Sequence, residues 1–192
     1  MGGEQGLVIL QGRNGDREGC ALGNFGLRRG MPTIDPATFR HVLGSYPTGV
    51  CAVTATSVSG SPTGMIVGSF SSVSLDPPLI GFFPGKTSRS WAAIAQAGRF
   101  CISVLGSDQL DVCTKLAASG DNKFSGLTHQ TSANGSPIID GSLAWIDCDL
   151  HDVVDAGDHV FVMGRVIALE AGREGDPMLF FKGRYGGFKD LA

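Results

Sequence analysis

The chain has 192 residues, 42% of them hydrophobic, which is enough for one domain with a sizeable core. A formal net charge of −3 with only 15 Lys and Arg residues argues against a nucleic-acid-binding surface. The apolar run Leu7 to Leu10 is too short for a signal peptide or a membrane span, so we expect no membrane association. The 5 cysteines include no Cys-x-x-Cys pair, which predicts reduced thiols in a cytoplasmic protein.

Residues 1–30 are rich in glycine and lack hydrophobic periodicity. They predict a poorly ordered N-terminal extension, followed by one domain over residues 31–192. This domain opens with a predicted helix, because Asp35 suits an N-cap, Pro36 suits the first helical position and Gly44 would end the helix. Residues 50–56 are rich in β-branched side chains and predict a strand.

The stretch from Thr63 to Pro78 is the most informative part of the sequence. It begins as a strand, but the alternation of apolar side chains changes phase after Val67. We therefore expect a bulge or short loop near Gly68-Ser69. Glycines and serines here would let the backbone approach a flat ligand closely. An edge strand with a serine-rich bend and no ligand explains the same residues equally well.

Further strands are predicted over residues 79–83, 100–105, 142–154, 160–169 and 178–181, with a polar loop over 121–137. A helix beginning near Trp91 would end near Gly98, and Ser107 would cap a second helix through Ala117. Its inward residues would be Leu110, Cys113, Leu116 and Ala117. Six or seven strands with three short helices predict a mainly β protein, a small barrel rather than a doubly wound sheet.

The segment Gly85-Lys86-Thr87 suggests a phosphate-binding P-loop, but its neighbours exclude one. Gly81 and Gly85 are separated by three residues instead of four, and two of these are phenylalanines that cannot cradle phosphates. An anion site of another kind is favoured, because two basic and three hydroxyl side chains precede the predicted helix: Lys86, Thr87, Ser88, Arg89 and Ser90. An ordinary capped helix with solvated basic residues is the alternative.

His159 follows the tight turn Gly157-Asp158 and lies at the mouth of a predicted strand, where it could contact a ligand. A purely structural histidine is the alternative. The segment 184–187 offers a tyrosine ring and flexible glycines, or an ordinary surface. His41, His129 and His151 have no partners at metal-ligand spacing, so we predict no metal site. No arrangement typical of a serine or cysteine nucleophile is present.

Several motifs, in a fixed order, resemble the flavin reductase family over about residues 34–187. They are Phe39-Arg40, Pro47-Thr48-Gly49-Val50, the run from Ser69 to Pro78, Lys123-Phe124 with Gly126, Gly141 to Trp145 with Cys148, and Gly157-Asp158-His159 with Gly164-Arg165-Val166. The likeness is greatest to the reductase partners of flavin-dependent hydroxylases of aromatic and steroid catabolism. The N-terminal extension lies outside it.

The resemblance implies an FMN-binding split barrel of Greek-key topology that forms a homodimer. The implied activity is hydride transfer from NADH or NADPH to FMN or FAD, which supplies reduced flavin to a partner monooxygenase. Basic residues that could hold the 2′-phosphate of NADPH are Arg165, Lys182 and Arg184. The alternative is a non-catalytic split-barrel flavoprotein that holds FMN as an electron carrier.

The resemblance also assigns site residues. Together with Lys86 of the anion site, the flavin contacts would be Pro62, Thr63, Gly64, Met65, Ile66, Gly68, Ser69, Phe83, Pro84, Gly85, Ser88, Arg89, Ser90 and Lys115. The nicotinamide nucleotide would contact His159, the candidate catalytic residue, and Phe180, Phe181, Lys182, Gly183 and Tyr185. The chain departs from the family pattern at Gly68 and at Leu116-Ala117.

Overall fold

The computed structural model describes residues 33–120 and 122–191. Contacts between residues divide the chain into the units Met1–Ile34 and Asp35–Ala192, and every described helix and strand belongs to the second unit. The predicted extension over residues 1–30 lies outside the described residues. It therefore stays a prediction.

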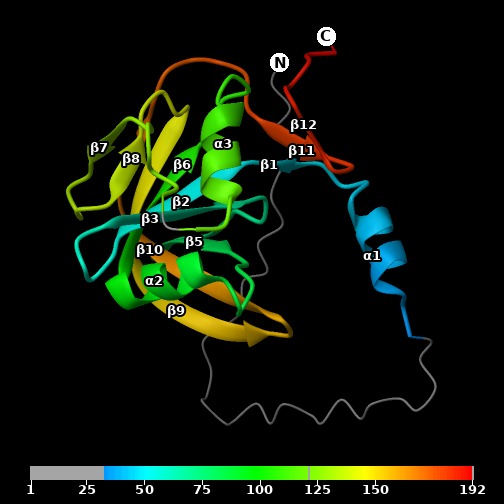
Figure 1. Cartoon of the computed structure of the whole chain (residues 1–192), viewed down its shortest axis with the longest axis horizontal. Coiled ribbons are helices and arrows are strands. Elements are labelled where there is room, and N and C mark those ends of the chain that lie inside the picture. Colours follow the sequence, from blue (N-terminus) through cyan, green and yellow to red (C-terminus); the bar gives the residue numbers. More distant parts are fainter. Residues whose placement is uncertain (1–32, 121, 192) are drawn as a thin grey trace. The chain divides into compact units, whose positions relative to one another are not determined.

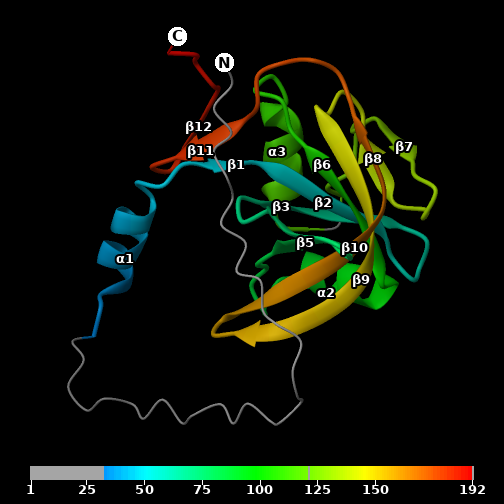
Figure 2. The same cartoon turned by 180° about the vertical axis from the view of Figure 1, so that it is seen from behind.

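The second unit is built on a seven-stranded antiparallel sheet with the strand order β3-β2-β6-β9-β10-β5-β4 (Figure 1). Its strands are β2 (Cys51–Thr56), β3 (Pro62–Val67), β4 (Ser71–Leu75), β5 (Pro78–Phe82), β6 (Arg99–Val104), β9 (Ala144–Ala156) and β10 (His159–Ala171). The longest two, β9 and β10, form a hairpin that extends beyond the other strands (Figure 2).

Two smaller sheets and three short helices complete the described fold. The sheets are β1 (Thr48–Gly49) with β11 (Leu179–Phe181) and β12 (Arg184–Gly186), and β7 (His129–Thr131) with β8 (Pro137–Ile139). The helices are α1 (Pro36–Leu43), α2 (Arg89–Ala97) and α3 (Leu110–Ala117). The mainly β architecture with three short helices is therefore confirmed.

The predicted change of phase after Val67 is real. Strand β3 ends at Val67, and the chain passes through residues 68–70 before β4 begins at Ser71. Leu75 then pairs with Pro78 across a tight turn, so β4 and β5 form a hairpin. The prolines end β4 as expected, although Pro78 already belongs to β5.

Buried side chains form two clusters. In the first, Trp91 and Ile94 of α2 pack on the sheet, where Phe82 meets the rings of Trp91 and Phe100 edge to face at 6.0 and 5.5 Å. In the second, Cys113 and Leu116 of α3 pack with residues such as Leu105 and Met178. Strand β2 contributes to both clusters, which explains why five of its six residues are buried.

Several boundaries differ from expectation. Helix α3 begins at Leu110 after Gln109, not after Ser107, and no side-chain hydrogen bond caps it. The side chain of Gln109 accepts from the Gly106 amide and donates to the Asp140 carbonyl, so it joins the segment before the helix to a later loop. Leu110 and Ala117 are exposed, and Val112 is buried in their place. The predicted loop over residues 121–137 contains β7, and the three-residue strand β12 was also missed, because such short strands carry no period.

Candidate functional site

Two pockets share strand β3. Residues 65–67, at its C-terminal end, line one pocket, and Pro62 and Thr63, at its N-terminal end, line the other. We call the first the apolar pocket and the second the basic pocket.

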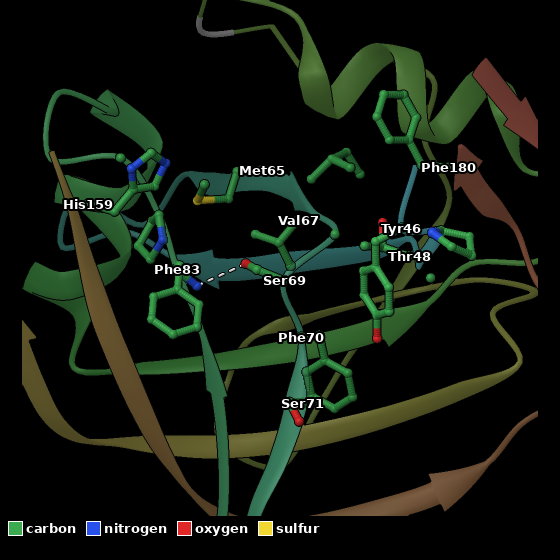
Figure 3. Close-up of a pocket in the computed structure, with 16 residues that line it drawn as sticks. Tyr46, Thr48, Met65, Val67, Ser69, Phe70, Ser71, Phe83, His159 and Phe180 are labelled. Carbon is green, nitrogen blue, oxygen red and sulfur yellow. Dashed lines mark hydrogen bonds between the residues drawn. The ribbon is translucent and has the colours of Figure 1, made fainter. Parts of the chain in front are cut away.

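The apolar pocket has a volume of about 810 Å³, and Figure 3 shows Met65, Phe83 and His159 at one end of it and Tyr46 and Phe180 at the other. Its lining comes from five separate segments of the chain. The lining residues are Tyr46, Pro47, Thr48, Gly49, Met65, Ile66, Val67, Gly68, Ser69, Phe70, Ser71, Phe83, Pro84, Gly85, His159 and Phe180.

The bend after β3 shapes this pocket. A Cβ on Gly68 would lie 2.7 Å from Oγ1 of Thr48, so only glycine allows β1 to approach this closely. The next residue, Ser69, accepts a hydrogen bond from the Phe83 amide at 2.9 Å (Figure 3). The ring of Phe83 stacks on that of Phe161 with centroids 4.8 Å apart, and this fixes its orientation.

The turn of the β9–β10 hairpin borders the same pocket. Gly85 pairs with His159 as an isolated bridge, and the Val160 amide donates to the Pro84 carbonyl at 3.1 Å. The side chain of His159 is held by Asp158, whose Oδ1 lies 2.8 Å from Nδ1. This hydrogen bond, and then the charge of His159, lower the pKa of Asp158 below its usual value.

The basic pocket has a volume of about 670 Å³ and surrounds the N-terminus of α2. Of its described lining residues, the charged ones are Arg89 and Lys123. The lining consists of Ser57, Val58, Ser59, Ser61, Pro62, Thr63, Thr87, Ser88, Arg89, Ser90, Ala93, Gln96, Ala117, Ala118, Ser119, Gly120 and Lys123. Ser88 is the N-cap of the helix, and its Oγ accepts the Trp91 amide at 3.2 Å.

Lys123 joins the elements around this pocket. Its Nζ donates to the Gly64 carbonyl at 3.2 Å, to Oγ of Ser90 at 3.0 Å and to the Leu116 carbonyl at 3.0 Å. These acceptors belong to β3, α2 and α3. Burial, and then the charge of Arg89, lower the pKa of Lys123 below its usual value. The pocket thus carries two cationic groups next to the free amides of a helix N-terminus.

The structure distributes the predicted flavin residues over the two pockets. The apolar pocket brings together Met65, Ile66, Gly68, Ser69, Phe83, Pro84 and Gly85 with His159 and Phe180, and the basic pocket brings together Pro62, Thr63, Ser88, Arg89 and Ser90. Gly64 lies between them on β3. The roles of all these residues stay predictions.

The remaining predicted site residues lie outside both linings. Lys86 forms an ion pair with Asp155 of the hairpin, with Nζ and Oδ1 3.0 Å apart. Lys115 donates to the Gly126 carbonyl at 3.3 Å. The others, Phe181, Lys182, Gly183 and Tyr185, belong to the β11–β12 hairpin or its turn, in which Nζ of Lys182 lies 5.3 Å from the Phe181 ring centroid.

The β11–β12 hairpin is nevertheless tied to the apolar pocket. The ring of Tyr185 lies 5.1 Å from that of Phe180, which lines the pocket. A hydrogen bond with Cys113, together with burial, raises the pKa of Tyr185 to about 12. The interaction with Cys113 places Tyr185 of the hairpin beside α3.

Lys123 and the hairpin carboxylates Asp155 and Asp158 were not predicted as site residues. The Lys123-Phe124 motif was the one available signal for the lysine. Within residues 33–120 and 122–191, no group of three His, Cys, Asp or Glu side chains could hold a metal ion. No helix of this part of the chain is long and apolar enough to cross a membrane.

Comparisons with known proteins agree on one family. The family model "Flavin reductase like domain" matches residues 43–189. A flavin reductase of Pseudomonas putida is 56% identical over 155 residues, covering 81% of this chain and 91% of that protein. The reductase subunit HsaB of a flavin-dependent monooxygenase from Rhodococcus jostii is 47% identical, and the match covers 81% of this chain and 80% of that protein.

A solved structure extends the agreement to the fold. It is the NADH:FAD oxidoreductase SgcE6 of Streptomyces globisporus in complex with NAD and FAD fragments, with a TM-score of 0.77 and 31% identity, covering 84% of this chain and 99% of that one. The split-barrel fold expected from the sequence is therefore confirmed. The chain belongs to the flavin reductase family.

Proposed function

We propose that this protein is an NAD(P)H-dependent flavin reductase that supplies reduced flavin to a partner flavin-dependent monooxygenase. Family membership supports the activity, and the relative HsaB, named as the reductase subunit of a flavin-dependent monooxygenase, supports the partner. The observation that carries the proposal is the pair of adjoining pockets on β3, one apolar and one basic. A bound flavin would supply the redox chemistry, by accepting a hydride from the nicotinamide ring.

The two pockets fit the two ends of a flavin nucleotide. The apolar pocket is of the size that binds small organic ligands, and Met65 and Phe83 offer flat or flexible apolar contacts to a ring system. The basic pocket offers Arg89, Lys123 and helix amides to a phosphate. Residues 63 and 65 lie about 7 Å apart along an extended strand, so a short carbon chain would connect ring and phosphate.

The task of the protein residues is alignment. Hydride transfer between stacked rings needs a near-attack distance and no strong acid or base. Phe83 is held in place by its stack on Phe161 and by the bond from its amide to Ser69. These contacts give one wall of the apolar pocket a fixed position. His159 reaches the same pocket from the hairpin and is the residue that we assign to the nicotinamide nucleotide.

The cofactor pair is tested by steady-state kinetics. We expect a small amount of protein to oxidise a large excess of NADH only when free FMN or FAD is added. Measuring all four combinations of flavin and nicotinamide nucleotide identifies the preferred pair. Absence of turnover with every combination would contradict the proposal. A purified protein that keeps its flavin through dialysis and turns over poorly would instead identify an electron carrier.

The phosphate assignment has a sharper test, because riboflavin lacks the phosphate. Arg89→Met should raise the apparent KM for FMN about tenfold, the loss of one charge-assisted bond of about 1.5 kcal/mol, and leave that for riboflavin unchanged. Arg99→Met is the matched control, because Arg99 donates to the Asn134 carbonyl and lies outside both linings. An equal change for both flavins would remove Arg89 from the phosphate site.

We also propose that the protein acts as a homodimer. Helix α1 has eight residues, none of them buried, and isolated helices this short are unstable in water. Its apolar side chains Phe39, Val42 and Leu43 are 52%, 59% and 57% exposed, which supports burial of this face by a second copy.

Light scattering tests this association. The wild type should have about twice the chain mass of 20.0 kDa. Val42→Glu on the apolar face should shift the protein toward the monomer, whereas His41→Glu, which adds the same side chain beside that face, should not. A monomeric wild type would refute the homodimer.

The four described cysteines are free and buried, which supports a location in the reducing cytoplasm.

A further inference from the structure

The end of the β9–β10 hairpin presents two carboxylates, Asp155 near the end of β9 and Asp158 in the turn, and each is paired with a different basic side chain. Asp155 lies 3.0 Å from Nζ of Lys86, and Asp158 lies 2.8 Å from Nδ1 of His159. Two backbone hydrogen bonds join this turn to the wall of the apolar pocket. The Val160 amide donates to the Pro84 carbonyl at 3.1 Å and the Lys86 amide donates to the Asp158 carbonyl at 3.0 Å, and together they form the bridge between Gly85 and His159.

Because the backbone on both sides of His159 is fixed, the orientation of its ring depends on rotation about the side-chain bonds alone. The contact with Asp158 selects one such orientation. In it, Nδ1 faces the carboxylate, and Nε2 is the nearest atom to a Cβ built on Gly85, at 3.9 Å. Gly85 lines the apolar pocket, so Nε2 is the nitrogen presented to that side.

We propose that Asp158 is a positioning residue for the reaction: its carboxylate accepts the Nδ1–H of His159 and so presents Nε2 to the nicotinamide nucleotide. The proposal rests on the proposed function and goes beyond it, because Asp158 itself lies outside both pocket linings. The hydrogen bond at one imidazole nitrogen determines what the other nitrogen can do. With Nδ1–H donated to Asp158, the neutral ring offers Nε2 as an acceptor, which fits an amide N–H such as that of the nicotinamide carboxamide.

The other charged groups near the turn do not replace Asp158. Lys86 is engaged with Asp155, and its backbone amide donates to the Asp158 carbonyl, so it faces the same turn from the neighbouring segment. Asp155 is in turn occupied by Lys86. Asp158 is thus the carboxylate that acts on His159.

The kinetic test is a double-mutant cycle of Asp158→Ala and His159→Ala. Asp158→Ala should lower kcat/KM for NADH about threefold to tenfold, the range for one lost hydrogen bond, with the KM for flavin unchanged. In the His159→Ala background it should have no further effect. Asp158→Glu should restore part of the loss. Additive effects of the two alanine substitutions would overturn the proposal, because a merely structural role does not need His159.

Two controls make the outcome specific. Asp152→Ala removes an exposed carboxylate of the same hairpin that accepts from the adjacent Val153 amide at 2.7 Å, and it should leave kcat/KM unchanged. Thermal unfolding should give the same midpoint for wild type, Asp158→Ala and Asp152→Ala. A lowered midpoint in Asp158→Ala that Asp158→Glu does not restore would make the role structural and overturn the proposal.

A spectroscopic measurement separates failure of this inference from failure of the proposed function. The ¹⁵N chemical shifts of the His159 ring, assigned with His159→Gln, report which nitrogen carries the proton whether or not the protein oxidises NADH. We expect the proton of the neutral ring on Nδ1 in the wild type and its redistribution to Nε2 in Asp158→Ala. A proton on Nε2 in the neutral wild-type ring would overturn the proposal even in an active enzyme.

Discussion

Replacing Lys123 by methionine tests whether one side chain holds the basic pocket together. The change keeps most of the aliphatic volume and removes the ammonium group, which donates to Gly64, Ser90 and Leu116. Hydrogen bonds to charged groups contribute about 1.5–3 kcal/mol each, and breaking one leaves a carbonyl unsatisfied. Because the side chain of Lys123 is only partly buried, water can replace some of the lost hydrogen bonds. We therefore expect a total loss of about 2–3 kcal/mol in the free energy of unfolding.

The assay is thermal and urea unfolding without flavin, followed by circular dichroism. For a domain of this size each kcal/mol shifts the melting temperature by about 2–4 °C, so Lys123→Met should melt about 4–12 °C below the wild type. Lys115→Met is the matched control, because Nζ of Lys115 makes one exposed bond of 3.3 Å to Gly126. We expect a loss below about 1 kcal/mol for it. Equal losses in the two variants would refute the role of Lys123.

Three other substitutions or measurements test separate features. Gly81→Ala would place a Cβ against the ring of Phe161 and displace the ring from its stack with Phe83. It should lower the free energy of unfolding in urea by about 1–3 kcal/mol and raise the KM for flavin. An unchanged KM would show that the stacked rings do not shape the flavin site. Burial raises the pKa of Cys51 and of Cys148 to about 12 and also raises the pKa of Cys101. Mass spectrometry should therefore find these three thiols unlabelled by iodoacetamide in the native protein at pH 8 and labelled in urea. Labelling of the native protein would contradict the core packing. Hydrogen bonds from the Thr38 amide and hydroxyl lower the pKa of Asp35. The stability that the Asp35 carboxylate adds to α1 is therefore complete above its unfolded-state pKa and is lost as the pH falls through its lower folded-state pKa. In NMR spectra the chemical shift of the Thr38 amide should titrate below pH 3.8 in the wild type and should not do so in Asp35→Asn.

The fold was predictable wherever the sequence repeats a simple period. The change of phase after Val67 located the end of β3, because a two-residue alternation cannot pass through a bend unbroken. Asp35 and Gly98 marked helix ends through local hydrogen bonding and a left-handed backbone. Strands of two or three residues, such as β1 and β12, carry no such period and form because β11 pairs with both.

The candidate site was predictable only as sequence segments. The run from Lys86 to Ser90 was expected to act as one anion site. In the structure Ser88 caps α2 and the chain turns there, so Arg89 and Ser90 line the basic pocket while Lys86 faces Asp155. Lys86 as a flavin contact stays a prediction. Sequence order alone cannot show that Lys86 faces away from Arg89 and Ser90, because its partner carboxylate, Asp155, is almost 70 residues away along the chain.

Lys123 shows a second limit. Its three acceptors come from β3, α2 and α3, which are far apart in the sequence and meet only in the folded structure. A lysine in a polar stretch is ordinarily a solvated surface residue, so local reasoning gives no reason to select it. The family resemblance identified the motif but not the contacts.

Both pockets are lined by residues of β3, and a side-chain hydrogen bond fixes one lining residue of each. This arrangement suits the alignment of a ligand rather than acid–base chemistry. Ser69 fixes Phe83 beyond one end of β3, and Lys123 fixes Ser90 beside the other. A ligand bound at both ends of this strand, as we propose for the flavin, would keep its ring at a set distance from the hairpin that carries His159. Because alignment depends on several contacts at once, we expect single substitutions in the two pockets to lower the rate by modest factors, unlike the loss of a catalytic nucleophile.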